Sequence, residues 1–370
     1  MKTVLLWHIL TLAQRLWFGT WIIVEASSLN DYNSPIEVAT KTAALENEAE
    51  QIHIGEEVYE RFVYFSKACG LCNCIDKKLL RENKTLDDGG CPSYLNFCSD
   101  PSQNPTYNQT RIVLVLEAEE NELGTGYLAV DHEKKVIILA FRASTTAQDW
   151  QSDFETYPKE YYPVSSNEYW DLVRHGVIKE CTNCKVHKGF SRFLETLGKH
   201  FLAKVQKIIT NYPDYHIVSV GHSLGAALAA LAGIELKLRG YRVSVITYAQ
   251  PKIFNRDLKE WVDDLFNTRL LNAIAEYGSC LSSATGYIRV VHENDYVPMI
   301  PPFFHHAGLE VVISTRELPH NIQHLTYIGY NNLVTTEKAE RLGMNSNLEE
   351  LLHMYEHRNY FITLTGCTGF

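Results

Sequence analysis

Two features are missing from this chain of 370 residues: it has no low-complexity linker and no internal repeat. Their absence excludes an array of repeated modules and leaves no obvious place to divide the chain into separate domains. The composition is 45% hydrophobic and 11% aromatic, which is ample for one large core. We therefore expect a single domain over residues 27–370, preceded by a targeting segment over residues 1–26.

Positive charge is scarce, because 34 Lys and Arg residues stand against 44 Asp and Glu residues, a net charge of −10. An acidic balance argues against nucleic acid as a partner and against electrostatic docking on anionic membranes. The charge fits an uncharged partner, or it serves solubility alone.

No apolar run near the N-terminus reaches the roughly 20 residues of a membrane-spanning helix. Lys2 precedes one short run, VLLWHIL, and a second, LWFGTWIIV, ends at residues 24–26 (VEA), with Gln14 and Arg15 between them. This pattern predicts a signal peptide cleaved before Ser27, and hence a secreted protein. The alternative is an uncleaved shallow anchor, with the protein held at a membrane of the secretory pathway or vacuole.

The chain has nine cysteines, which indicates an oxidising compartment. Asn83 and Asn108 open N-x-T sequons, which are typical of glycosylated secreted surfaces. Cys69, Cys72 and Cys74 have the spacing C-x2-C-x-C without a matching second pair, so a zinc site is not favoured. We expect no metal and no organic cofactor.

Residues 216–239 read HIVSVGHSLGAALAALAGIELKLR and carry the strongest signal. A β-branched run leads into a G-x-S-x-G pentapeptide centred on Ser223, and an Ala- and Leu-rich helical pattern follows. A serine on a sharp turn between strand and helix exposes its hydroxyl, and the two glycines avoid Cβ clashes. The N-terminus of the following helix favours a developing negative charge. Ser223 is therefore the candidate nucleophile.

A carboxylate and a histidine are expected to follow such a serine in the chain. Asp295 comes directly after the apparent strand IRVVH, at the strand end where such sheets place ligand-binding groups. Three other acids, Asp257, Asp263 and Asp264, lie in a polar helical stretch and are poorer candidates. Spacing alone leaves the histidine open among His305, His306, His320, His324, His353 and His357.

From about Val58 to the C-terminus, the chain resembles the fungal class 3 lipases of the Rhizomucor and Thermomyces type, and most closely the secreted yeast lipases of the Yarrowia type. The resemblance rests on six segments in family order: GTGYLAVDH (124–132), FRAST (141–145), CTNCKVHKGF (181–190), YPDYHIVSVGHSLGAALA (212–229), HENDYVP (292–298) and HRNYF (357–361).

The resemblance implies roles for particular residues. Ser223 matches the nucleophile, Asp295 the acid and His357 the base of a catalytic triad. Ser144 matches a side-chain donor of the oxyanion hole, and Leu224 matches the residue whose backbone N–H is another donor.

The resemblance also implies three disulfides, Cys69–Cys367, Cys181–Cys184 and, more loosely, Cys91–Cys98. One further bridge to Cys280 would leave a single free thiol. Ala143 and Ala226 depart from the family, which usually has glycine at both positions. No cysteine lies between Cys280 and Cys367, so the histidine-side disulfide of the Yarrowia-type lipases is absent.

Residues 145–157 match the short amphipathic lid of the family. Trp150 and Phe154 are four residues apart and would share one helical face, with polar residues around the rest. Such a segment could close over a pocket in water and turn its apolar face towards lipid. The alternative is a surface helix with two ordinary core aromatics. The apolar face is narrow, so we expect modest interfacial activation.

The fold class expected from these patterns is α/β, an α/β-hydrolase fold with a mostly parallel central sheet flanked by helices. We expect a serine hydrolase that cleaves the carboxylic esters of lipids, with triacylglycerol at an oil–water interface as the first candidate substrate. The alternatives are a phospholipase or another carboxylesterase, or a catalytically silent lipid-binding relative. The expected helices are residues 40–66, 190–211, 224–239 and 257–265, and the expected strands are residues 112–117, 127–130, 136–141, 217–220, 243–248, 288–292 and 311–313.

Overall fold

The structure is a computed structural model that describes residues 51–119, 122–143, 157–330, 353–368 and 370. The chain divides into two units, Met1–Ala49 and Glu50–Phe370, and the description below concerns the second. The signal peptide predicted for residues 1–26 therefore lies outside the described residues. Among the helices that are described, none is long and apolar enough to cross a membrane.

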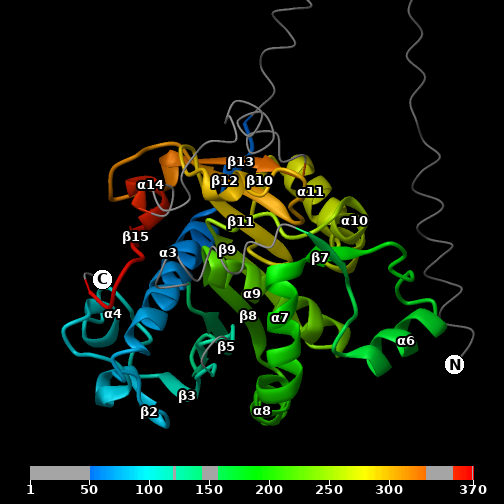
Figure 1. Ribbon diagram of the computed structural model, residues 1–370. Helices are drawn as coiled ribbons and strands as arrows, with labels where there is room; N and C mark the ends of the chain where they lie inside the picture. The colour runs from blue at the N-terminus through cyan, green and yellow to red at the C-terminus, as the bar shows by residue number, and fades with distance from the viewer. Residues whose placement is uncertain (1–50, 120–121, 144–156, 331–352, 369) are drawn as a thin grey trace, which may run out of the picture. The chain divides into compact units, whose positions relative to one another are not determined.

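A nine-stranded sheet forms the centre of the second unit, in the order β13-β12-β11-β9-β8-β5-β4-β3-β2 (Figure 1). The middle strands β12, β11, β9, β8 and β5 are parallel to one another. The outer strands β13, β4, β3 and β2 are antiparallel to their neighbours, so the sheet is mixed and only its middle is parallel. The strands are β2 (Lys84–Thr85), β3 (Thr110–Leu116), β4 (Gly126–Asp131), β5 (Val136–Phe141), β8 (His216–His222), β9 (Val243–Tyr248), β11 (Tyr287–His292), β12 (Leu309–Ile313) and β13 (Leu325–Gly329).

Helices cover both faces of this sheet, with α3 (Glu56–Leu71) on one side and α7 (Lys188–Thr196) and α9 (Leu224–Leu238) on the other (Figure 1). Side chains alternate between the faces along a strand. Accordingly, Val218 and Val220 of β8 belong to the core that includes Phe62 of α3, whereas Ile217 belongs to the core that includes Leu228 of α9. The continuous apolar character of the middle strands follows from burial on both sides.

The helix α9 fixes the position of the chain just before it. Nearly all of its side chains are buried, as expected for a helix that is apolar on every face. A Cβ on Gly233 would lie 2.3 Å from Cγ2 of Val245, so the helix packs against the sheet more closely than any larger residue would allow. The N-terminus of α9 is therefore held at the carboxyl end of β8.

Two predicted helices have different bounds. Residues 40–50 of the first predicted helix lie outside the described residues. From residue 51 on, the strand β1 (His53–Ile54) and the extended Gly55 precede the helix, which begins at Glu56 and continues to Leu71 rather than ending at Ser66. The helix predicted for residues 190–211 begins at Lys188 and is interrupted by a π-helical segment, η3 (Leu197–Phe201), before α8 (Leu202–Ile209).

Several elements were not predicted, among them α6 (Ser166–Arg174), α11 (Thr268–Tyr277) and β13. The buried residues of β13 alternate with half-buried ones, so an alternation in LTYIG was available as a signal. The remaining elements are β6 (Pro158–Glu160), β7 (Lys185–His187), β10 (Cys280–Leu281), β14 (Asn359–Tyr360), β15 (Ile362–Thr363), η1 (Cys72–Cys74), η2 (Leu86–Gly90), α4 (Asn96–Ser99), α10 (Arg256–Leu265), η4 (Val297–Met299), η5 (Ile322–His324) and α14 (Tyr355–Arg358).

The disulfides agree with the expectation in two cases out of three. Cys91–Cys98 and Cys181–Cys184 are formed, but the expected pair Cys69–Cys367 is wrong, because Cys367 is bonded to Cys74. Cys69 lies inside α3, next to Ala68, whose carbonyl accepts the hydroxyl of Tyr127, so this part of the helix faces the sheet. Cys74 lies beyond the helix end, with its Cα 4.8 Å from that of Cys367. Cys280 is a free thiol, so the suggested bridge to Cys280 is also wrong.

Replacing Cys74 with Ser should destabilise the protein strongly. The bond closes a long loop, and removing a native disulfide from a secreted domain typically costs about 2–5 kcal/mol. Cys69→Ala serves as the matched control, since Cys69 is buried but unbridged, and it should have a much smaller effect. Denaturant unfolding of both variants checks this; equal losses of the free energy of unfolding would contradict the pairing.

Candidate active site

The turn that carries Ser223 is sharply constrained. Ser223 has φ of 58° and ψ of −127°, a conformation that side-chain-bearing residues rarely adopt, and its N–H donates to the carbonyl of Tyr248 at 2.9 Å. A Cβ on Gly221 would lie 2.1 Å from the carbonyl oxygen of Gly225, and one on Gly225 would lie 2.3 Å from that of Phe141. Both outer positions of the pentapeptide therefore require glycine.

Three predicted residues from distant parts of the sequence meet at this turn. Oγ of Ser223 lies 2.9 Å from Nε2 of His357, and Nδ1 of His357 lies 3.1 and 3.0 Å from the two carboxylate oxygens of Asp295. A carboxylate can only accept, so Nδ1 carries the proton and Nε2 is free to accept the serine hydroxyl. All three side chains are buried.

Elements of the sheet bring these residues together. Ser223 follows β8 and Asp295 follows β11, both at carboxyl ends of parallel strands. His357 lies in α14, a single helical turn immediately before β14.

The carboxylate of Asp295 has further partners. Its Oδ2 accepts the hydroxyl of Tyr360 at 2.7 Å, and its Oδ1 accepts the N–H of Val297 at 3.0 Å. Burial alone would raise the pKa of Asp295, but the attraction to His357 and these hydrogen bonds together lower it below its ordinary value. Asp295 is therefore held as a carboxylate. Sequence reasoning gave no role to Tyr360, although it lies in the HRNYF segment.

His222, the residue before the serine, also contacts the base. Its Nε2 lies 2.7 Å from the backbone carbonyl of His357, and the two imidazole rings lie 4.8 Å apart. Burial, with a smaller contribution from His357, lowers the pKa of His222 to about 3, so it is neutral at ordinary pH. Because a carbonyl can only accept, Nε2 of His222 carries the proton. No role for His222 was predicted.

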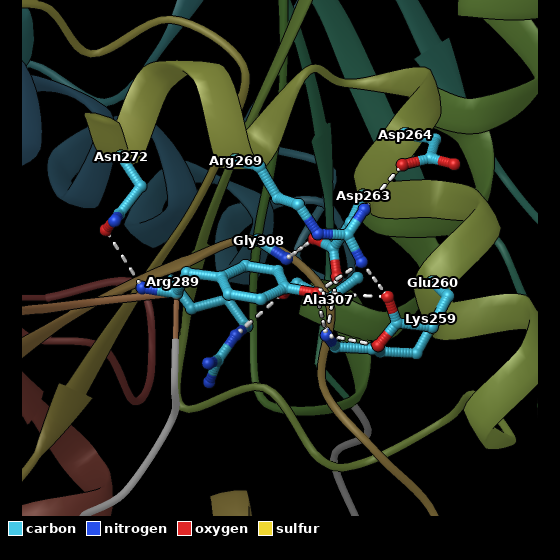
Figure 2. A network of polar contacts seen from close by, with 10 residues as sticks. Lys259, Glu260, Asp263, Asp264, Arg269, Asn272, Arg289, Ala307 and Gly308 are labelled. Carbon is cyan, nitrogen blue, oxygen red and sulfur yellow. Dashed lines mark hydrogen bonds and ion pairs between the residues drawn. The ribbon is translucent and has the colours of Figure 1, made fainter. Parts of the chain in front are cut away.

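The other candidate acids and histidines have different partners. Asp263 accepts the N–H of Gly308 at 2.8 Å and lies 3.0 Å from Lys259, and Asp264 pairs with Arg269, as Figure 2 shows. The remaining candidate histidines have other partners. The backbone N–H of His305 donates to the carbonyl of Phe254, and the side chain of His306 donates to the carbonyl of Pro298. The Nδ1 atoms of His320 and His324 accept backbone N–H groups, and His353 is exposed.

The predicted oxyanion donors are only partly described. Leu224 is the first residue of α9, where backbone N–H groups have no partner within the helix. Ser144 lies outside the described residues, as do the lid residues Trp150 and Phe154. The chain leading to Ser144 is fixed as far as Arg142, whose N–H donates to Thr125 at 2.9 Å and whose guanidinium pairs with Asp76.

The described residues contain no group of three or more side chains suited to hold a metal ion. Of the three neighbouring cysteines Cys69, Cys72 and Cys74, the last forms a disulfide with Cys367, so its sulfur cannot be a thiolate ligand.

Comparisons with known proteins agree with this fold. The family model "Lipase (class 3)" matches residues 138–305. The chain is 53% identical over 312 residues to LIH1, a Saccharomyces cerevisiae protein whose name leaves its lipase activity open, covering 84% of this chain and 95% of that one. It is 32% identical over 288 residues to the secreted mono- and diacylglycerol lipase 2 of Gibberella zeae, covering 65% and 68%.

Solved structures give the same result for the fold. The Lip2 lipase of Yarrowia lipolytica superposes with a TM-score of 0.61 at 25% identity, over 85% of this chain and 96% of that one. The fold is the α/β-hydrolase fold, and its relatives are serine ester hydrolases. The chain belongs to the class 3 lipase family.

Acid should destabilise the fold through its buried histidines. The pKa values of His187, His216 and His320 are each lowered to about 4 and that of His222 to about 3, in every case first by burial. The unfolded chain protonates its histidines near pH ~6.5, so between that pH and the folded-state values the unfolded state binds more protons. Stability is fully present above pH ~6.5 and falls as the pH drops towards 4.

The variant His222→Gln tests this assignment, because glutamine takes up no proton. The slope of unfolding free energy against pH between 6 and 4.5 should decrease by about one proton relative to wild type. Urea unfolding at several pH values measures it. Parallel slopes for wild type and His222→Gln would contradict the assignment.

Proposed function

We propose that this protein is a secreted triacylglycerol lipase in which Ser223, His357 and Asp295 form the catalytic triad. The observation that carries the proposal is the continuous hydrogen-bonded chain from Oγ of Ser223 through His357 to Asp295, at the turn between β8 and α9. A serine hydroxyl is a weak nucleophile until a base accepts its proton, and the base needs a carboxylate to fix its tautomer.

In the acylation step, Oγ of Ser223 attacks the ester carbonyl carbon while Nε2 of His357 takes the hydroxyl proton. The carboxylate of Asp295 stabilises the resulting imidazolium, and Tyr360 and Val297 keep that carboxylate ionised and oriented. The carbonyl oxygen becomes an oxyanion that accepts the Leu224 N–H and the Ser144 hydroxyl. Donors aimed in advance at such an oxygen contribute on the order of 3 kcal/mol each.

The tetrahedral intermediate collapses when His357 gives its proton to the alcohol oxygen of the glyceride. The bond from the carbonyl carbon to that oxygen breaks, the alcohol leaves, and an acyl group remains on Ser223. Water then attacks the acyl-serine with His357 again as the base, and the fatty acid is released.

Support for a glyceride substrate comes from the relatives, of which several are named mono- and diacylglycerol lipases. The net charge of −10 fits a neutral lipid and repels the released fatty-acid anion. We place triacylglycerol first and other carboxylic esters second.

Replacing Ser223 with Ala should abolish hydrolysis of emulsified triolein, with a loss on the order of 10⁴-fold or more, since the triad acts as a unit. A fluorophosphonate probe should label the wild type at Ser223 and fail to label the variant. The same assay with a short-chain p-nitrophenyl ester separates lipase from esterase. A folded wild type that is silent on both esters and unlabelled would support the alternative of a lipid-binding relative.

The proposal includes a lid at residues 145–157. Its narrow apolar face, Trp150 and Phe154, predicts a modest rise in rate at an oil surface. With one short-chain ester measured both as a monomer and as an emulsion, equal rates, corrected for surface area, would contradict a lid.

Secretion belongs to the same proposal and is supported by relatives that are named as secreted lipases. Protein collected from the culture medium should begin at Ser27 and carry N-linked glycans at Asn83 and Asn108, both of which are exposed. Terminal sequencing and glycopeptide mass spectrometry measure this. An intact Met1 in the mature protein would show instead that the segment is an uncleaved anchor.

A further inference from the structure

A cleft of about 550 Å³ opens between β6, β7, the beginning of α10 and the loop after η4. Its volume falls within the range of small-molecule sites. None of the residues that line it belongs to the Ser223–His357–Asp295 chain. Its Phe303 and Phe304 follow Asp295 in the chain, with η4 between them.

One wall of the cleft is apolar. Phe303 has 78% of its surface exposed, which is unusual for a large apolar side chain. Its neighbour in the chain, Phe304, is buried, with its ring centroid 5.1 Å from that of His187. Pro158, the first residue of β6, completes the apolar lining.

The lining of the cleft also carries one carboxylate that has no ion-pair partner among the described residues. Lys185 lines the cleft, but its ammonium lies 3.3 Å from the carboxylate of Glu160, so the pair is neutral. The carboxylate of Asp257 accepts a hydrogen bond from the side-chain amide of Asn255 at 3.5 Å and makes no ion pair within the described part of the chain. The cleft therefore offers an aromatic face and a carboxylate to a cationic group.

We propose that this cleft binds the choline headgroup of a phospholipid, with the trimethylammonium group against the ring of Phe303 and the carboxylate of Asp257. A quaternary ammonium has no N–H to donate, and it is recognised by an aromatic face together with a negative charge. The phosphate oxygens of the headgroup then accept a hydrogen bond from the side-chain amide of Asn183, which lines the same cleft. This inference rests on the proposed lipid hydrolase and adds choline phospholipid to its substrates.

Binding is measured by isothermal titration of phosphocholine into the full-length Ser223→Ala protein, so that the result does not depend on turnover. In that background, Phe303→Ala and Asp257→Asn should each weaken binding about fivefold or more, and Phe303→Trp should retain it. Phosphoethanolamine should bind more weakly than phosphocholine. The proposal is overturned if the two headgroups bind equally, or if both variants bind phosphocholine like the parent.

Two control variants separate the site from general surface effects. Tyr277→Ala removes an aromatic ring that is 96% exposed on α11, and Glu56→Gln removes an acid from the first turn of another helix, as Asp257→Asn does for α10. Both should bind phosphocholine like the parent. Loss of binding in either control would overturn the assignment to this cleft.

Hydrolysis tests the consequence for the substrate. With Ser223 restored, Phe303→Ala and Asp257→Asn should raise the KM for a soluble short-chain phosphatidylcholine and leave kcat for a short-chain triglyceride unchanged. An equal effect on both substrates would overturn the proposal. A wild type that hydrolyses neither ester but binds phosphocholine in the cleft would refute the hydrolase and leave this site standing.

Discussion

The hydrogen bond between His357 and Asp295 depends on most of the structure around it. Asp295 is placed by the end of β11, whereas His357 comes from a single helical turn that has little stability of its own. That turn is held from several sides at once: His222 donates to the carbonyl of His357, Tyr360 donates to Asp295, and the disulfide Cys74–Cys367 fixes the chain beyond it. The single turn of α14 is therefore held in place by its contacts with neighbouring elements rather than by its own helical hydrogen bonds.

The sheet and the nucleophile turn could be predicted from the sequence because their causes are local. A buried parallel strand needs a continuous apolar run, so Val136–Phe141 and Val243–Tyr248 have the predicted bounds. The two glycines around Ser223 are required by contacts of 2.1 and 2.3 Å within the turn and to β5. Asp295 follows from the rule that such sheets place functional groups at carboxyl strand ends.

What the sequence could not specify depends on long-range contacts. His222 and Tyr360 are distant in the chain, yet both bear on the same acid and base, and no spacing indicates this. The partner of Cys367 was assigned to Cys69 from resemblance, and only the end of α3 at Leu71 shows why Cys74 is the one within reach. His357 could be chosen among six histidines only through the family motif, because the local sequence pattern did not distinguish it from the other five.

The bond between Cys74 and Cys367 closes a covalent ring of residues 74–367, and Ser223, Asp295 and His357 all lie within it. Exposed loops are the usual places where a protease cuts a folded chain. A single cut in a loop of this ring leaves the two resulting pieces joined through the disulfide. The piece that carries Ser223 therefore stays attached to the piece that carries His357, whichever loop between them is cut.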